Sequence, residues 1–502
     1  MSTLTLANLV SAMNGSTTTN QWDVVCSYSV DALNSFLKAS YDAGNLAKTV
    51  IMTVTEKDPV FGFDYQVLYS INFGSPLLSF SALQGIAILS MPMETGSSYT
   101  VTVPNSNQPP QVTPIPPGYS VVAQVPLAVV DGETGTVVAN QPGVLTFSNG
   151  STSQFSVILE FNNKAGTLFT LSPAPSGSSP LETYFLPAIT NYFQTQVSQI
   201  DYALAAVNNT PSGGGVVFSP KSFVFTSYYD PTIQSDNGAL SLYIQTTNSG
   251  NPPGSSTPQF QPGGMATSPI PSGYTASLIF SNALMMNAYL KPQLAADNFT
   301  ATFSTPKSGL QAALTTNADV VANSDNGTYI SGSYYYQGLD LSLETYPITM
   351  TILNGQMGCN WSGDTVSGWT TNTAGQPYPQ WGNVKISVTA EKVVTMAVND
   401  NAITIPSITF SQSDFKATTT PQSCPWYETL TGCRTSLPAY YSGMQFSIPP
   451  ISISLPSFNF FLETNLLAPG NQMISIDAAA GVSTPCDFLL VGNTITVPTA
   501  GA

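Results

Sequence analysis

The sequence predicts a β-dominated α+β fold in which long helices are wrapped by strongly curved antiparallel sheets. Three observations predict it: many short segments rich in β-branched and aromatic residues, Asx-Gly pairs between them, and three segments with apolar residues at helical spacing. A helix with a wide apolar stripe must be covered along that stripe, and most of the remaining chain has the pattern of strands. The 502 residues are enough for two such units or one large one.

The strand-like segments are rich in Val, Ile, Phe, Tyr and Thr and often alternate with polar positions. They are residues 63–73, 121–130, 154–161, 240–246, 384–398 and 448–461. Turns that require positive φ favour Asx-Gly pairs, so antiparallel hairpins are expected between the strands. Such pairs are Asp131-Gly132, Asn149-Gly150, Asn237-Gly238, Asn326-Gly327 and Asn354-Gly355.

Three segments have helical spacing: residues 29–43, 180–208 and 281–296. In the first, Leu33 and Leu37 fall on one face. The third is expected to kink or end near Pro292, because proline lacks the amide that a helix interior needs. The second is the longest, and its apolar stripe consists of Phe185, Ile189, Phe193, Val197, Ile200, Leu204 and Val207.

Two segments rich in Pro, Gly and Ser, 104–118 and 248–273, are expected to be linkers or long loops. They end alike, in TPIPPGYS and SPIPSGYT, which suggests duplicated units. We therefore expect one helix-wrapped β unit in residues 1–250 and another in 251–502, although the termini can return to a single unit.

Composition excludes several functions. With 27 acidic and 11 basic residues the net charge is −16, and there is no histidine. Histidine-dependent catalysis and histidine metal sites are therefore excluded. So few cations also argue against nucleic-acid binding and against docking on anionic membranes. We expect no metal, no cofactor and no catalytic residues, because no spacing pairs the carboxylates, and the protein is not expected to be an enzyme.

No apolar run approaches the roughly 18 residues of a transmembrane span. The first 22 residues lack the basic start and apolar core of a signal peptide. We expect cytoplasmic synthesis, with any release by a non-classical route. Cys424 and Cys433 flank a turn-like stretch and could form a disulfide, or all five cysteines could be reduced and buried.

Three pairs of segments resemble the clostridial P47 and OrfX-type proteins of the tubular lipid-binding (TULIP) superfamily. They are residues 21–25 (QWDVV) with 34–37 (NSFL), residues 276–282 (ASLIFSN) with 289–294 (YLKPQL), and residues 464–472 (TNLLAPGNQ) with 485–493 (PCDFLLVGN). They cover about a sixth of the chain, in the order found in the family. Cys486 departs from the pattern, because the resemblance leads us to expect glycine there.

The resemblance implies helix-wrapped sheets around an apolar groove, and a non-enzymatic protein that binds lipid or another hydrophobic ligand. It also implies a bacterial toxin component or toxin-cluster accessory, with a toxin or a sibling TULIP-like protein as partner. The candidate ligand-lining residues are Leu33, Leu37, Phe185, Ile189, Phe193, Val197 and Leu204. The same residues could instead fill the interior completely, and the sequence leaves both possibilities open.

A second hypothesis is a surface protein that binds carbohydrate or a receptor. Trp361, Trp369 and Trp381 lie within a polar, turn-rich stretch that resembles a loop. Aromatic faces beside hydrogen-bonding groups suit sugar recognition. The alternative, which the sequence favours, is that the same tryptophans anchor a long loop onto the sheet.

Overall fold

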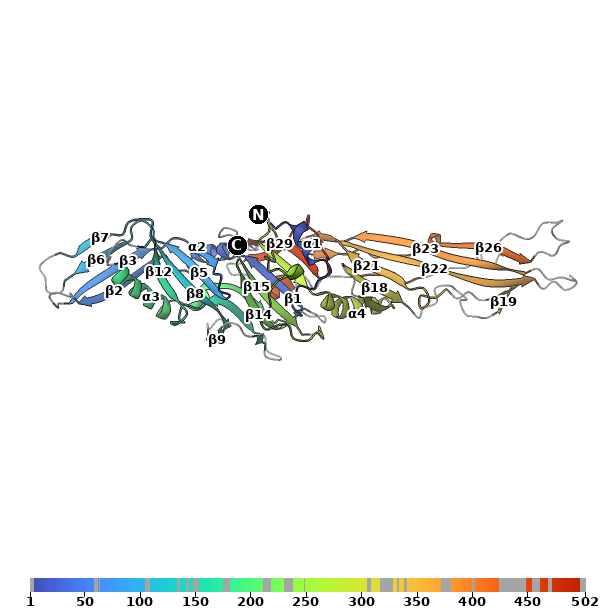
Figure 1. Cartoon of the computed structure of the whole chain (residues 1–502), viewed down its shortest axis with the longest axis horizontal. Coiled ribbons are helices and arrows are strands. Elements are labelled where there is room, and N and C mark those ends of the chain that lie inside the picture. Colours follow the sequence, from blue (N-terminus) through green and yellow to red (C-terminus); the bar gives the residue numbers. More distant parts are fainter. Residues whose placement is uncertain are drawn as a thin grey trace, which may run out of the picture.

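A computed structural model of the chain provides the structure. It describes residues 4–57, 62, 64–103, 109–132, 136–140, 144–147, 153–174, 181–210, 218–229, 238–247, 249–304, 308–316, 328–331, 334–337, 341–371, 381–399, 402–423, 448–453, 461–467 and 472–496. The molecule is elongated, and its first and last elements both lie near the middle (Figure 1). The predicted β-dominated α+β class is confirmed, including the strongly curled antiparallel sheet.

The middle of the molecule is one antiparallel sheet that combines the two ends of the chain. Its spatial order is β10 (Leu145–Thr146), β14 (Pro220–Tyr228), β15 (Ala239–Thr246), β1 (Val24–Ser29), β16 (Ala276–Phe280), β29 (Phe488–Thr496) and β28 (Gln472–Ile476). Every residue of β1, β15 and β16 is buried, since elements cover both faces of the sheet.

Two further sheets form one end of the molecule. The larger has the order β27 (Leu466–Leu467), β13 (Ala203–Asn208), β11 (Gln154–Leu159), β8 (Ser120–Asp131), β5 (Ile86–Pro92) and β4 (Leu77–Phe80), with β9 (Thr136–Asn140) and β12 (Leu168–Ser172) also paired to β8. The smaller has the order β2 (Thr49–Lys57), β3 (Asp64–Asn72), β6 (Ser98–Thr102) and β7 (Gln111–Pro114).

The other end consists of long hairpins. Its sheet has the order β17 (Thr300–Ser304), β18 (Leu310–Thr315), β21 (Ile348–Leu353), β22 (Gln356–Thr371), β20 (Tyr334–Gln337) and β19 (Thr328–Ser331), and β23 (Trp381–Thr395) joins β22 to β26 (Phe415–Ser423). A separate hairpin pairs β24 (Ala397–Asn399) with β25 (Ala402–Thr404). Asn354 and Gly355 both have positive φ in the turn between β21 and β22, as their sequence predicts.

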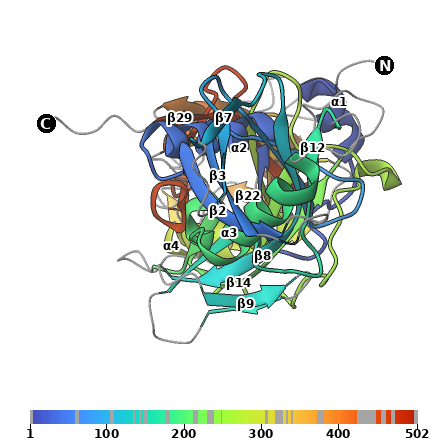
Figure 2. The same cartoon turned by 90° about the vertical axis from the view of Figure 1, so that its left-hand side faces the viewer.

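The helices are short. They are α1 (Leu6–Met13), α2 (Val30–Asp42), η1 (Leu181–Phe185), α3 (Leu186–Thr195), η2 (Gln199–Tyr202), η3 (Pro262–Gly264), η4 (Leu284–Leu290), α4 (Lys291–Ala296), η5 (Gln412–Asp414) and η7 (Phe461–Asn465). Of these, η1, η4 and η7 are π-helical. η1 continues directly into α3, and we call the two together helix 181–195. Figure 2 shows the strands of this end curled, with α3 beside β2.

The longest predicted helix, 180–208, is wrong in its second half. The helix ends at Thr195, and Leu204 lies in strand β13, which pairs with β11 and β27. The run Leu-Ala-Ala-Val at 204–207 is buried throughout. A short apolar run has no periodicity that separates strand from helix, so pairing with distant strands decides its conformation. The predicted helix 29–43 is confirmed by α2.

Two other predictions need correction. The supposed polar loop containing Trp361 and Trp369 belongs to strand β22, and Trp381 begins β23, the other strand of the same hairpin. Residues 448–461 do not form the predicted strand where they are described: Ile451 makes an isolated bridge with Ile408, and Phe461 begins η7.

Residues 249–273 of the expected linker cover the outer face of the central sheet. Phe260 is buried with Trp22 in a second, smaller core on that face, and the indole N–H of Trp22 donates to the Ser255 carbonyl at 2.9 Å. The expected boundary at residue 250 therefore falls beside a sheet that continues from β15 through β1 to β16. The division into 1–250 and 251–502 stays a prediction.

Candidate functional site

The predicted ligand-lining residues are core residues, and most of them cluster around helix 181–195. Phe185, Ile189 and Phe193 are spaced four apart and form the buried stripe of the helix. Leu33 and Leu37 are buried on α2, Leu204 is buried on β13, and Val197 is partly buried just after the helix. The structure therefore places all seven in or against one hydrophobic core, while their contact with a ligand stays a prediction.

Aromatic side chains pack closely beneath helix 181–195. The ring of Phe193 lies 5.1 Å from that of Phe161 and 5.6 Å from that of Phe169 on β12. At the other end of the helix, the ring of Phe185 lies 5.3 Å from that of Tyr69 on β3. The helix thus makes aromatic contacts with two sheets, and α3 starts without a side-chain cap.

A groove of about 550 Å³ runs between this helix and strand β2. β2 is an edge strand: it pairs with β3 along its whole length and has no second neighbour among the described strands. Six consecutive residues of β2, 51–56, line the groove, and Ile51 is 66% exposed. On the helix side the walls are Thr183, Tyr184, Pro187, Ala188, Asn191, Tyr192 and Gln196.

Only a thin layer separates the groove from the core. Tyr184, Ala188 and Tyr192 line the groove and also pack against the hydrophobic core. They alternate along the helix with the buried residues Phe185, Ile189 and Phe193. The polar groove therefore lies directly over the aromatic core.

The chemistry of the groove is nearly neutral. Glu56 is the one charged side chain among its lining residues, and the others are hydroxyl, amide, aromatic or aliphatic. Burial raises the pKa of the nearby Tyr69 well above its ordinary value, and the Glu56 carboxylate with three neighbouring tyrosines raises it further. An anionic group entering here would meet a carboxylate, whereas a neutral polar group would meet hydrogen-bonding partners.

The sequence did not identify the β2 wall of the groove. Its alternating exposed and buried residues are those of any half-buried strand. Neither the free edge of β2 nor its position opposite the helix has a signal in a single sequence, because both arise from sheet order.

Trp361 is not a surface residue. It is 1% exposed, its indole N–H donates to the Tyr346 carbonyl at 2.9 Å, and its ring meets Phe410 edge-on. Its assignment as a recognition residue is therefore wrong. Side chains alternate between the two faces of a strand, and Trp361 lies on the face that points toward the core. A loop would not fix its direction in this way. The side chains of Trp369 and Trp381 lie outside the described residues.

Three of the segments that resemble the TULIP superfamily, 21–25, 276–282 and 485–493, meet at one end of the central sheet. Asp23 and Asp487 precede β1 and β29, and Asn282 follows β16. The Asp23 carboxylate accepts hydrogen bonds from the backbone N–H and the hydroxyl of Thr246. The Asp487 carboxylate accepts from the backbone N–H and the hydroxyl of Thr18 and from the backbone N–H of Asn282. These buried carboxylates tie strand ends together, so the role we assign them is structural.

Cysteines that the structure describes are free and buried: Cys26, Cys359 and Cys486. Burial raises the thiol pKa of Cys26 and Cys359 to about 12 and of Cys486 to about 11. Cys486, which stands where the resemblance leads us to expect glycine, accepts a hydrogen bond from the Asn282 side chain at 3.4 Å. Cys424 and Cys433 lie outside the described residues.

Within the described residues, no helix is long and apolar enough to cross a bilayer. Comparison with protein-family models and with curated proteins finds no match. Among solved structures, the chain is similar to P47 from Clostridium botulinum A2, with 14% identity and a TM-score of 0.48 over 95% of this chain and 98% of that chain.

Two other solved structures are similar to this one. P47 of Clostridium botulinum E1 has 14% identity and a TM-score of 0.47, over 94% of this chain and 98% of that chain. A lipopolysaccharide binding protein has 10% identity and a TM-score of 0.29, over 95% of this chain and 99% of that chain.

Proposed function

We propose that this chain is a non-enzymatic, TULIP-like protein that binds a neutral lipid between helix 181–195 and the curled sheet. The observation that carries the proposal is the groove between β2 and this helix, which lies directly over an aromatic core. The polar end of an amphipathic ligand would occupy the groove, and its apolar chain would enter beneath the helix.

Energetics support this arrangement. Each methylene removed from water contributes about 0.8 kcal/mol, so a chain of ten carbons contributes about 8 kcal/mol toward the cost of displacing helix 181–195. The helix buries one stripe, Leu181, Phe185, Ile189 and Phe193, and its other described side chains are partly or fully exposed. Elements with few buried contacts open at lower free energy than the rest of a protein.

The charge of the site favours a neutral ligand. Glu56 lies in the groove, and the whole chain carries a net charge of −16. A fatty-acid carboxylate would be repelled by both, whereas the glycerol end of a monoacylglycerol could bond to Thr53, Thr183 and Asn191. We therefore infer a neutral or zwitterionic headgroup.

Titration of the delipidated protein with a fluorescent monoacylglycerol tests the proposal. We expect saturable binding, tighter than that of a fluorescent fatty acid of equal chain length. Ala188→Trp fills the groove and should weaken binding about tenfold or more. Ala295→Trp, a matched change on the exposed side of α4, should leave binding unchanged. Absence of saturable binding, or equal affinity of the two variants, would contradict the proposal.

The resemblance found in the sequence also leads us to propose a toxin or a sibling protein as partner. Neighbouring genes give the direct test. Toxin genes and paralogues of this chain beside its own gene would support the proposal, and their absence would count against it.

A further inference from the structure

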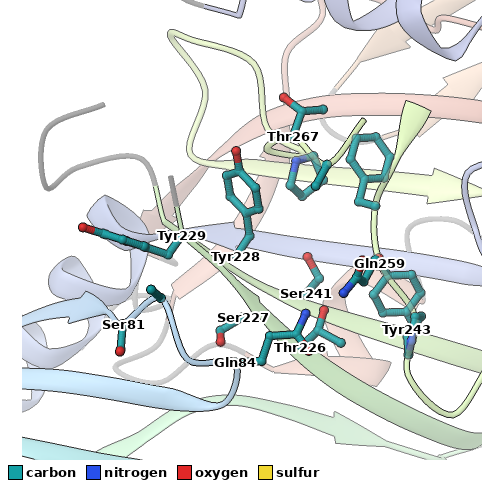
Figure 3. Close-up of a pocket in the computed structure, with 15 residues that line it drawn as sticks. Ser81, Gln84, Thr226, Ser227, Tyr228, Tyr229, Ser241, Tyr243, Gln259 and Thr267 are labelled. Atoms are coloured by element: carbon teal, nitrogen blue, oxygen red, sulfur yellow. The ribbon is translucent and has the colours of Figure 1, made fainter. Parts of the chain in front are cut away.

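A second cavity lies on the outer face of the central sheet, away from helix 181–195. It encloses about 180 Å³ between β14, β15, the turn at residues 81–84 and the covering segment at 258–269. Figure 3 shows Tyr228 and Tyr229 on one side of this pocket and Tyr243 with Gln259 on the other. We call it the sheet pocket.

Strand register builds the floor of the sheet pocket. Thr226 lies opposite Ser241, and Val224 opposite Tyr243, across the β14–β15 pair. Side chains two apart on a strand share a face, so Thr226, Ser241 and Tyr243 point to the same side. The opposite face of the two strands carries Phe223, Phe225, Leu240 and Leu242, which belong to the main core.

The lining of the sheet pocket has no charged side chain. Eight of its fifteen residues carry hydroxyl groups, two carry amides, and the others are Ala, Pro and Phe. An apolar ligand would leave these hydroxyls without partners, which costs free energy. An anionic ligand would find no cation among the lining residues. A neutral ligand rich in hydroxyl groups can bond to the lining groups and also stack on the tyrosine rings.

One buried hydroxyl in the wall of the sheet pocket lacks a hydrogen-bond partner among the described residues. Tyr243 is fully buried, and within the described part of the chain its hydroxyl makes no hydrogen bond of good geometry, although the Thr226 hydroxyl lies beside it. Buried hydroxyls usually have a partner, so a ligand that displaces the side chains around this one would gain a hydrogen bond. The Ser227 hydroxyl already accepts from the Gly85 backbone N–H, and the Ser241 hydroxyl is hydrogen-bonded to that of Ser27. These two side chains are therefore held in place in the wall of the sheet pocket.

The volume of the sheet pocket limits the size of the ligand that it can bind. At roughly 30 Å³ for each water, 180 Å³ corresponds to about six water molecules. Drug-sized ligands occupy pockets of roughly 300 Å³ or more. The space therefore suits a single small ring and not an oligomer or an acyl chain.

We propose that the sheet pocket binds one neutral sugar ring, as a free monosaccharide, as the terminal residue of a glycan or as the headgroup of a glycolipid. The three sources share the same chemistry, a pyranose with several hydroxyls and an apolar face. This site is separate from the groove beside β2, with which it shares no lining residue.

Glycan-array binding by the full chain tests the proposal, with free monosaccharides as competitors and glycolipid vesicles as a third format. We expect retention on neutral terminal sugars, in preference to sialylated or sulfated ones. Tyr243→Phe should weaken that binding about three- to tenfold, because it removes one hydrogen-bonding group without changing the volume. Competition by a free monosaccharide would show that the sugar ring alone is the ligand. Binding only to vesicles would show that the ligand is a glycolipid headgroup.

Two controls keep the result interpretable. Tyr28→Phe makes the same change at another fully buried tyrosine, which lies on β1 outside the sheet pocket, and should leave binding unchanged. Ala188→Trp should also leave it unchanged, because that residue lines the other site. Failure to bind any neutral glycan in all three formats, or equal binding by the Tyr243→Phe variant and the wild type, would overturn the proposal.

Discussion

Polar residues of the family-like motifs act as structural clamps. The Asn34 side chain both donates to and accepts from the backbone of Leu78, at 3.1 and 2.6 Å, and so fastens α2 to β4. The Asn465 amide donates to the Asn208 and Thr210 carbonyls at the end of β13. Each motif residue joins segments far apart in the sequence. Such residues can resemble a family without marking the site where a ligand binds.

Asp487 makes a pH-dependent contribution to stability. Burial outweighs its hydrogen bonds and raises its carboxyl pKa above the ordinary 3.8. The folded state therefore holds this proton more tightly than the unfolded chain, and stability falls as pH rises from about 4 through the raised pKa. The Asp487→Asn substitution removes this dependence of stability on pH. It also replaces the carboxylate that accepts from the Thr18 donors by an amide, which lowers the free energy of unfolding by about 1–3 kcal/mol.

Urea denaturation of the wild type and the Asp487→Asn variant between pH 4 and pH 8 measures this effect. The difference in free energy of unfolding between the two proteins should be largest at the acidic end and should shrink as pH rises. A difference that grows with pH would show that the carboxyl pKa is lowered in the folded state.

At the scale of elements, two helices show how proline is accommodated. Pro187 and Pro292 each come two residues after a π-helical segment, η1 and η4, and the helix continues beyond both. Proline lacks an amide and its ring clashes with the carbonyl four residues earlier, whereas a π turn shifts that carbonyl. We expected a kink or an end near Pro292, and the helix runs on to Ala296.

Helix 181–195 should show a large difference in stability between its two faces. Phe193 is buried among Phe161, Phe169 and Tyr202, whereas its neighbour Tyr192 is partly exposed on the groove. Phe193→Ala should cost about 3–5 kcal/mol, because it leaves a cavity. Tyr192→Ala should cost about 1 kcal/mol, as for most mutations. Chemical denaturation compares the two, and equal losses would show that the buried stripe does not hold the helix.

Sequence patterns predicted the fold class, several strands and the three helical segments, but they did not predict how the segments combine. Periodicity is local: it places Phe185 and Phe193 on one face of a helix, as observed. Whether Leu204 continues that helix depends on β11 and β27, which lie far away in sequence. The groove depends on sheet order in the same way, so only half of its wall was predictable.

At the scale of the whole molecule, the central sheet unites the two halves of the chain. β1 from the first half pairs along its length with β15 on one side and β16, from the second half, on the other. Residues 1–250 and 251–502 produced separately should therefore each lack strands that their core needs. We expect neither to unfold cooperatively alone, and mixing them should restore a cooperative transition. Cooperative unfolding of each isolated half would contradict this.

The central claim is that a neutral lipid enters between β2 and helix 181–195. Hydrogen–deuterium exchange of the full chain, with and without saturating monoacylglycerol, tests it most directly. The lipid should slow exchange at Thr49–Lys57 and Leu181–Thr195 and leave β1 and β15 unchanged. Unchanged exchange in both segments at saturation, or protection confined to other elements, would contradict the account.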